Sequence, residues 1–158
     1  MIKFILVDLF RVLLFPKDKT YLGDLNPLYT EKAKNPDNHF FDYLEFNTEL
    51  LSFLATLTSR FTFCLFTAAT EVQHTPEAQS VLGPIFKATY STEKLGMRKT
   101  DPESFQLVCS YLRAIPPEIM YIGDNSACVE AAGKAGISGI LYTTNSQTIS
   151  DLKAKLNI

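Results

Sequence analysis

The first apolar run of the chain, residues 4–7, ends on a single carboxylate, Asp8. Apolar side chains occupy both alternating faces of this run, which predicts a strand buried in the middle of a sheet. A strand that runs into an acid places that acid at the carboxyl end of the sheet, where open α/β folds bind their ligands. We therefore expect Asp8 to lie at the functional edge of the molecule.

Strand-like and helix-like patterns alternate from residue 47 to the end of the sequence. The predicted strands are residues 61–67, 86–90, 119–122 and 137–142, and the predicted helices are residues 47–58, 76–82, 102–112, 127–135 and 150–156. Asn47 and Asp101 are expected to cap two of these helices, with Pro102 in the first helical position after Asp101. Gly136 is expected to end the helix 127–135.

This alternation predicts an α/β fold: a three-layer, Rossmann-like parallel sheet of about five strands, flanked by helices and joined by right-handed crossovers. Residues 14–46 break the pattern, because they combine three prolines with scattered aromatic residues and have no clean period. We expect this short insertion after the first strand to be ordered and to lie over the carboxyl edge, with short helices or as a loop pinned by its aromatic side chains. With 158 residues, the chain is expected to be one domain, 1–158.

Composition narrows the class of protein. The chain is 46% hydrophobic and 20% charged, as globular proteins are, and its net charge of −2 comes without the Lys/Arg cluster that nucleic acid binding needs. No apolar run approaches the roughly 18 residues of a membrane span. Three cysteines without C-x-x-C spacing, and a beginning unlike a signal peptide, predict a cytoplasmic protein with no disulfide framework and no zinc site. A dinucleotide is not expected, because no G-x-G-x-x-G follows the first strand.

Four polar residues fall where the predicted sheet would bring them to one edge. Asp8, Thr67 and Asp124 end three predicted strands, and Lys99 lies in a loop just before a capped helix. Two carboxylates with neighbouring carbonyls and waters suit octahedral Mg²⁺, whereas a hydroxyl, an ammonium and backbone N–H groups suit a phosphate. A carboxylate beside both is placed to attack phosphorus and form an aspartyl-phosphate. Lys99, Thr67 and Asp124 each have an ordinary structural explanation when taken alone. Asp8 is the hardest to explain in that way, because an acid after a buried strand costs free energy unless it is paired or metal-bound.

In this order, the four points resemble the motifs of the haloacid dehalogenase-like (HAD) superfamily, specifically its subfamily with an α-helical cap. Residues 7–13, Val-Asp-Leu-Phe-Arg-Val-Leu, are similar to the first motif, D-x-D-G-[TV]-L, and residues 65–67, Leu-Phe-Thr, to the second, an apolar strand ending in Thr or Ser. Residues 91–105 resemble the third, G-x-x-K-P-D-P-x-x-F, and residues 122–136 the fourth, G-D-x-x-x-D-h-x-A-A-x-x-A-G. The resemblance covers nearly the whole chain outside the insertion.

The resemblance implies a role for each residue. Asp8 would be the nucleophile, and Lys99 would orient it as the second catalytic residue. Thr67 and Lys99 would bind the transferring phosphoryl group. Mg²⁺ would be the cofactor, held by Asp8, Asp124 and the main-chain carbonyl of Phe10. The partner would be a small phosphorylated metabolite or an unidentified protein, and residues 14–46 would be a reduced cap.

Three residues depart from the motifs. Phe10 stands where hydrolytic members carry a second aspartate as general acid/base, a function worth about 10²–10⁴-fold in rate, so slow turnover is expected. Cys128 stands where an acidic or Asn residue often supports the metal site. Arg11 replaces a glycine, and is expected either to crowd the site or to bind an anion. The insertion is also shorter than a full helical cap, which suggests an open site, a macromolecular substrate or a partner that completes the site.

These departures leave three hypotheses open. The first is a Mg²⁺-dependent phosphohydrolase or phosphotransferase of weak or altered activity, with Asp8 as its nucleophile. The second is a catalytically inactive HAD-like protein that uses the fold for binding or regulation. The third is a haloacid dehalogenase-type hydrolase, a branch that carries an aromatic residue where Phe10 stands and needs no metal. Asp124 and the short insertion argue against the third.

Overall fold

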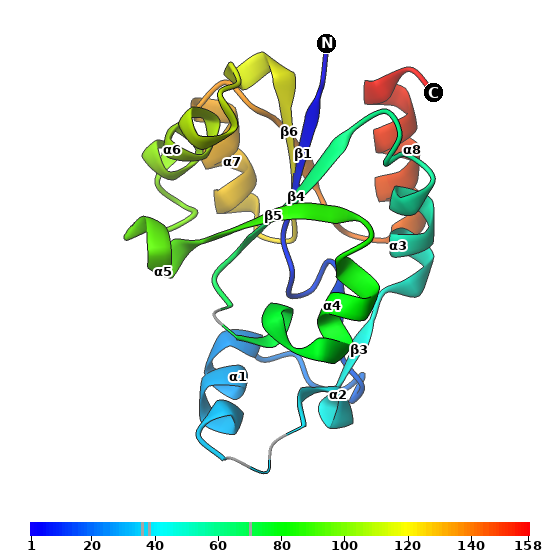
Figure 1. Ribbon diagram of the computed structural model, residues 1–158, viewed down its shortest axis with the longest axis vertical. Coiled ribbons are helices and arrows are strands. Elements are labelled where there is room, and N and C mark those ends of the chain that lie inside the picture. The colour runs from blue at the N-terminus through cyan, green and yellow to red at the C-terminus, as the bar shows by residue number, and fades with distance from the viewer. Residues whose placement is uncertain (36, 38, 70) are drawn as a thin grey trace.

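A computed structural model describes residues 1–35, 37, 39–69 and 71–158 (Figure 1). The strands are β1 (Phe4–Val7), β2 (Leu14–Pro16), β3 (Leu44–Phe46), β4 (Thr62–Thr67), β5 (Phe86–Ser91), β6 (Ile119–Gly123) and β7 (Ser138–Leu141). The helices are α1 (Leu25–Ala33), α2 (Phe40–Tyr43), α3 (Thr48–Ala55), α4 (Pro76–Leu82), α5 (Thr92–Leu95), α6 (Pro102–Leu112), α7 (Ser126–Lys134) and α8 (Asn145–Leu156), with short 3₁₀ helices η1 (Val72–His74) and η2 (Pro116–Glu118).

The core is a five-stranded sheet in the order β5-β4-β1-β6-β7, in which every pairing is parallel. The predicted α/β class, with about five parallel strands flanked by helices, is therefore confirmed. The strand β1 lies in the middle, and Val7 is level with Leu65 of β4 and with Ile122 of β6. This register brings the carboxyl ends of three neighbouring strands to the same height.

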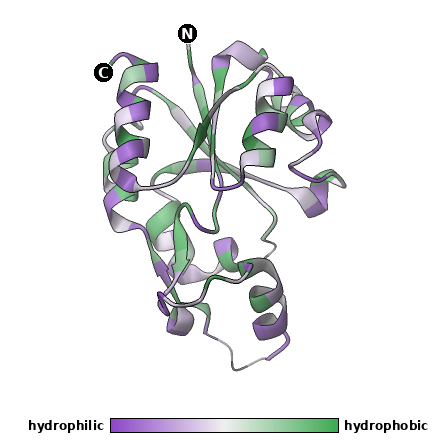
Figure 2. Ribbon diagram, turned by 180° about the vertical axis from the view of Figure 1, so that it is seen from behind, coloured by the Kyte–Doolittle hydropathy of each residue, from purple (hydrophilic) through white to green (hydrophobic). Residues whose placement is uncertain are grey.

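Helices cover both faces of the sheet, as Figure 1 shows. On one face, apolar residues of the strands pack with residues of α3, α4 and α8, and on the other they pack with residues of α6 and α7. Figure 2 shows apolar residues along the central strands and polar residues on the outer sides of the flanking helices. The strand β1 is buried between the two layers, as the run of apolar residues on both its faces predicts.

Two helix starts differ from the prediction. Asp101 stands at the N-cap position of α6, but its carboxylate makes no capping hydrogen bond and lies 3.4 Å from the guanidinium of Arg98. The last helix begins at Asn145 rather than at residue 150, with the Thr144 side chain accepting a hydrogen bond from the Gln147 N–H. The first turn of this helix is polar and shows no helical pattern of apolar residues, so in the sequence only the capping residue Thr144 marks where the helix begins.

The insertion leaves the core through β2 and returns through β3, which pair antiparallel, with Leu14 opposite Phe46. These two strands were not predicted, because each is only three residues long. Along the chain, α1 and α2 come between β2 and β3, and in the fold both helices lie beyond the carboxyl end of the sheet (Figure 1). Of the three prolines noted in this segment, Pro36 lies outside the described residues.

Within the described residues, no helix is long and apolar enough to cross a membrane. Cys64, Cys109 and Cys128 are free thiols, and all three are buried.

Candidate active site

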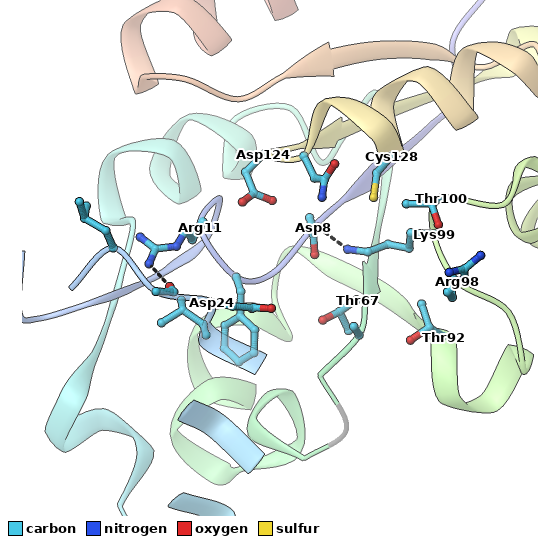
Figure 3. Close-up of a pocket in the computed structure, with 16 residues that line it drawn as sticks. Asp8, Arg11, Asp24, Thr67, Thr92, Arg98, Lys99, Thr100, Asp124 and Cys128 are labelled. Atoms are coloured by element: carbon cyan, nitrogen blue, oxygen red, sulfur yellow. Dashed lines mark hydrogen bonds and ion pairs between the residues drawn. The ribbon is translucent and has the colours of Figure 1, made fainter. Parts of the chain in front are cut away.

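The predicted site residues converge on one cavity of about 430 Å³ at the carboxyl edge of the sheet. Asp8 follows β1, Thr67 ends β4, Asp124 follows β6, and Lys99 reaches the cavity from the loop between α5 and α6. Figure 3 shows these side chains around the same space. Phe10 also lines it, so every candidate from the sequence lies in one place.

Both carboxylate oxygens of Asp8 have a partner, and only 6% of the residue's surface is exposed. One carboxylate oxygen, Oδ1, accepts a hydrogen bond of 2.8 Å from the N–H of Leu9. The other, Oδ2, forms an ion pair with the ammonium of Lys99, which also donates to the carbonyl of Phe66 over 3.3 Å. Both charged side chains are almost fully buried, so each depends on the other to offset its charge, and neither can turn away without leaving a buried charge unpaired. Lys99 therefore fixes the orientation of Asp8.

Thr67 is only 1% exposed, and its hydroxyl borders the cavity. The hydroxyl oxygen accepts a hydrogen bond of 2.9 Å from the N–H of Ala69. Because a hydroxyl carries one proton of its own, Thr67 keeps a donor for a ligand oxygen. The ammonium of Lys99 borders the same space, so the two residues together offer hydrogen-bond donors to an anion.

Asp124 lies close enough to Asp8 for the two carboxylates to interact. Partial loss of water raises the pKa of Asp124, and the negative charge of Asp8 raises it further, while Lys99 and Arg11 lower it. Two neighbouring carboxylates repel each other because both are negative, and a divalent cation between them relieves this repulsion. Among the described residues, no group of three or more His, Cys, Asp or Glu side chains is placed to bind a metal. A cation here would therefore use these two carboxylates with main-chain and water oxygens, a ligand set that suits Mg²⁺.

Phe10 forms part of the cavity wall and is buried, with 8% of its surface exposed. It belongs to the apolar cluster that joins the insertion to the α3, α4 and α8 side of the core. Cys128 is also buried at the cavity, and burial raises the pKa of its thiol, so that it stays protonated at neutral pH. Neither side chain can exchange a proton as a carboxylate does.

The profile of the haloacid dehalogenase-like hydrolases matches residues 15–142 of the chain. The chain belongs to this family. The matched range begins after Asp8, so the assignment does not depend on the altered first motif. No curated protein sequence matches the chain.

Solved structures of HAD proteins have the same fold. A HAD-like family hydrolase from Porphyromonas gingivalis is 16% identical and covers 100% of this chain and 99% of its own, with a TM-score of 0.70. A HAD family enzyme from Bacteroides thetaiotaomicron, in complex with magnesium and inorganic phosphate, is 19% identical over 90% of this chain and 95% of its own (TM-score 0.64). A HAD-superfamily hydrolase of subfamily IA from Geobacter sulfurreducens is 13% identical over 89% and 87% (TM-score 0.65).

Tyr121 was not expected at the site of this HAD-like protein. Its hydroxyl donates to Oδ2 of Asp8 over 3.4 Å, and its ring lies fully buried below the site. Burial and the charge of Asp8 raise the pKa of Tyr121 well above its usual value, so the hydroxyl keeps its proton. A Cβ on Gly123 would collide with this hydroxyl, so glycine before Asp124 makes room for it. The sequence carries no signal for this contact, because an apolar strand buries tyrosine as readily as phenylalanine.

The insertion supplies the opposite wall of the cavity. Its loop residues Leu22, Gly23 and Asp24 line it together with Leu25, the first residue of α1, and Thr92, Arg98, Thr100 and Asn125 lie on the rim. The sequence predicted that the insertion covers this edge but not which residues face the site, since the segment has no regular period. Two other polar residues follow Asp124: Asn125 borders the cavity, whereas Glu130 is exposed and pairs with Lys134.

Proposed function

We propose that the chain is a Mg²⁺-dependent phosphohydrolase or phosphotransferase that uses Asp8 as its nucleophile and turns over slowly. The observation that carries this proposal is the ion pair of Lys99 with Asp8, in one cavity with Thr67 and Asp124. Membership of the HAD-like hydrolases supports it. The complex of the Bacteroides enzyme with magnesium and phosphate supports the choice of metal and ligand.

Mg²⁺ would be held by the carboxylates of Asp8 and Asp124 and by the main-chain carbonyl of Phe10. Its charge would screen the phosphate from the carboxylates and stabilise the charge that develops during transfer. Lys99 and Thr67 would bind the phosphate oxygens, and Lys99 would hold Asp8 for attack on phosphorus. The cavity, at about 430 Å³, is larger than a phosphate group and suits a small phosphorylated metabolite.

In the proposed reaction, release of the phosphoryl group from Asp8 is the slow step. A carboxylate at position 10 would activate water, but Phe10 has no proton acceptor. The insertion, residues 14–46, would act as a reduced cap, because its loop closes only one side of the site. The three free thiols favour a reducing compartment such as the cytoplasm.

A second candidate is a catalytically inactive HAD-like protein that binds a phosphorylated ligand or a protein partner. Phe10 favours this second candidate, because its side chain is buried in the wall of the cavity and packs with the apolar cluster of the core. The retention of a buried Asp8–Lys99 pair favours the enzyme, because a binding protein has no need of a nucleophile.

Beryllofluoride, which mimics a phosphoryl group on an aspartate, separates these candidates. Thermal unfolding is measured with Mg²⁺ alone and with Mg²⁺ and beryllofluoride, in the wild type, in Asp8→Asn and in Asp151→Asn on α8 as a matched control. Saturating ligand is expected to raise Tm by about 5 °C or more in the wild type and the control, and not in Asp8→Asn. No shift in the wild type would exclude the enzyme.

A further inference from the structure

Arg11 has an unusual backbone conformation beside the nucleophile. Its φ is +59°, a left-handed value that glycine adopts freely and other residues rarely do. The hydrogen bonds of the turn enforce this conformation. The N–H of Arg11 donates to the carbonyl of Leu14, and the N–H groups of Leu13 and Leu14 both donate to the carbonyl of Leu9. A strained residue that its surroundings hold in place is a candidate for a functional role.

The side chain of Arg11 is fixed as firmly as its backbone. Its guanidinium donates to the carbonyl of Tyr21 over 3.2 Å and to that of Gly23 over 2.5 Å. Both acceptors are neutral, so these bonds orient the guanidinium without cancelling its charge. A guanidinium has five N–H donors and is always protonated, and this one borders the cavity that holds Asp8. Arg11 is therefore a positioned positive charge at the site.

Phe10 restricts which phosphoryl donors the site can use. When Asp8 attacks phosphorus, the bond to the leaving oxygen breaks and that oxygen keeps the electron pair. An alcohol leaving group needs a proton at this stage, and Phe10 cannot supply one. A carboxylate or a phosphate leaves as a stable anion without a proton, and a nearby guanidinium stabilises the charge that it gains.

We propose that the natural phosphoryl donor is an acyl phosphate or a phosphoanhydride, and that Arg11 binds its leaving group as it departs as an anion. This inference rests on the proposed function. Asp8 gains the phosphoryl group, the leaving group departs with the electron pair, and no proton is transferred in this step. Water then cleaves the aspartyl-phosphate slowly, returning Asp8 and inorganic phosphate and giving its proton to solvent.

The charges around the cavity agree with this role. Arg11 lines the same cavity as Asp8 and Asp124, so its positive charge lies at the site where a leaving group would gain negative charge. Three acids (Asp8, Asp24 and Asp124) and three cations (Lys99, Arg11 and Arg98) line the cavity. Asp8 and Asp124 are assigned to nucleophile and metal and Lys99 to the phosphate, which leaves Arg11 and Arg98 as cations for the rest of an anionic substrate, with Asp24 as the one further acid of the lining. Arg98 is 83% exposed in its side chain, so Arg11 is the better ordered of the two.

The test measures the first step alone, as covalent phosphate on the protein by intact mass spectrometry in the presence of Mg²⁺. Acetyl phosphate and pyrophosphate are compared with glycerol 2-phosphate, a donor with an alcohol leaving group. We expect the first two to label the wild type about 100-fold faster or more than the third. Labelling by glycerol 2-phosphate at an equal rate would overturn the inference and leave the proposed function standing.

Three variants separate the charge of Arg11 from its role as an anchor for the insertion. Arg11→Gly is expected to fold, because glycine adopts the same φ, and to slow labelling by acetyl phosphate and pyrophosphate about 10–100-fold. Arg11→Lys keeps the charge and should retain more of the rate than Arg11→Gly. Arg113→Gly, at the other left-handed arginine, lies away from the cavity and should react like the wild type.

Equal rates in Arg11→Gly and the wild type would overturn the role of Arg11, and equal loss in Arg11→Lys and Arg11→Gly would assign it to anchoring alone. The proposed function fails in a different way. In that case no donor labels the wild type, or Asp8→Asn is labelled at the wild-type rate.

Discussion

The carboxyl edge of the sheet and the insertion that faces it are held by different kinds of contact. At the edge, Asp8 and Thr67 are buried side chains at the ends of paired strands, and their positions follow from the register of the sheet. The insertion is held by its two short strands, by a few buried side chains that join the core cluster (Leu14, Leu25 and Leu44), and by exposed polar contacts, such as the bond of 2.5 Å from Lys17 to the carbonyl of Phe41. Its helix α1 lacks a regular apolar stripe.

This difference assigns two tasks to two regions: the edge of the sheet positions the site residues, and the insertion controls access to the site. Reacting groups need fixed positions, and buried strand ends provide them. A segment with a smaller share of buried side chains opens at a lower free energy than the core and can admit a substrate. Phe10 and Arg11 lie at the junction of the two regions, where the chain leaves the sheet for the insertion, and both differ from the family motif.

The largest expected effect is on the stability of the core. Phe105 is fully buried and packs edge-to-face against Phe66 and Tyr121, at centroid distances of 5.1 and 5.0 Å. Phe105→Ala should lower the free energy of unfolding by about 3–5 kcal/mol, measured by urea denaturation. In the insertion, Phe41 is half-buried and stacks on Phe46 at 5.0 Å, so Phe41→Ala should cost about 1–2 kcal/mol. Equal losses would show that both regions belong to one cooperative core.

The next effect concerns the junction. Phe10→Asp restores a carboxylate at the cavity and should raise the turnover of p-nitrophenyl phosphate by about 10–100-fold, or about 1.4–2.7 kcal/mol in the activation barrier. Phe10→Asn is the control, because asparagine is polar and similar in size to aspartate but cannot transfer a proton. An unchanged rate in Phe10→Asp would mean that Phe10 is not the limiting defect.

Asn47 ties the returning end of the insertion to the core. Its side chain donates to the carbonyl of Val12 over 2.9 Å, exchanges hydrogen bonds with Asn145 and caps α3. Asn47→Ala should destabilise the protein by about 1–2 kcal/mol. A double-mutant cycle with Asn145→Ala should give a coupling of about 0.5 kcal/mol or more, and strict additivity would contradict this link.

The smallest effect concerns the charge of Asp124. Because its pKa is raised in the folded protein, the folded state holds this proton more tightly than the unfolded state, so the ionised side chain destabilises the fold above that pKa. Asp124→Asn should therefore raise Tm by about 1–2 °C at neutral pH without Mg²⁺. The difference should shrink as the pH falls through the pKa of Asp124 towards 3.8. Mg²⁺ should stabilise only the wild type, and a lower Tm in the variant without Mg²⁺ would contradict this account.

The regular part of the fold was predictable because local periods carry it. Alternating strands and helices predicted the parallel sheet, and the sheet predicted that Asp8, Thr67 and Asp124 meet at one edge. The strands of the insertion and the first turn of α8 escaped prediction. Strands of three residues have too few positions for a period, and the start of α8 is polar, so only Thr144 signals it.

The sequence by itself determined the family, the edge at which the site lies and the absence of a carboxylate at position 10. It did so because motif residues sit at the ends of strands, whose order and direction follow from the chain. Only the tertiary structure decided that Tyr121 reaches Asp8 and that Arg11 grips the loop at Tyr21 and Gly23. These contacts depend on side-chain direction and on the path of an irregular segment, and neither is encoded in a local pattern of apolar and polar residues.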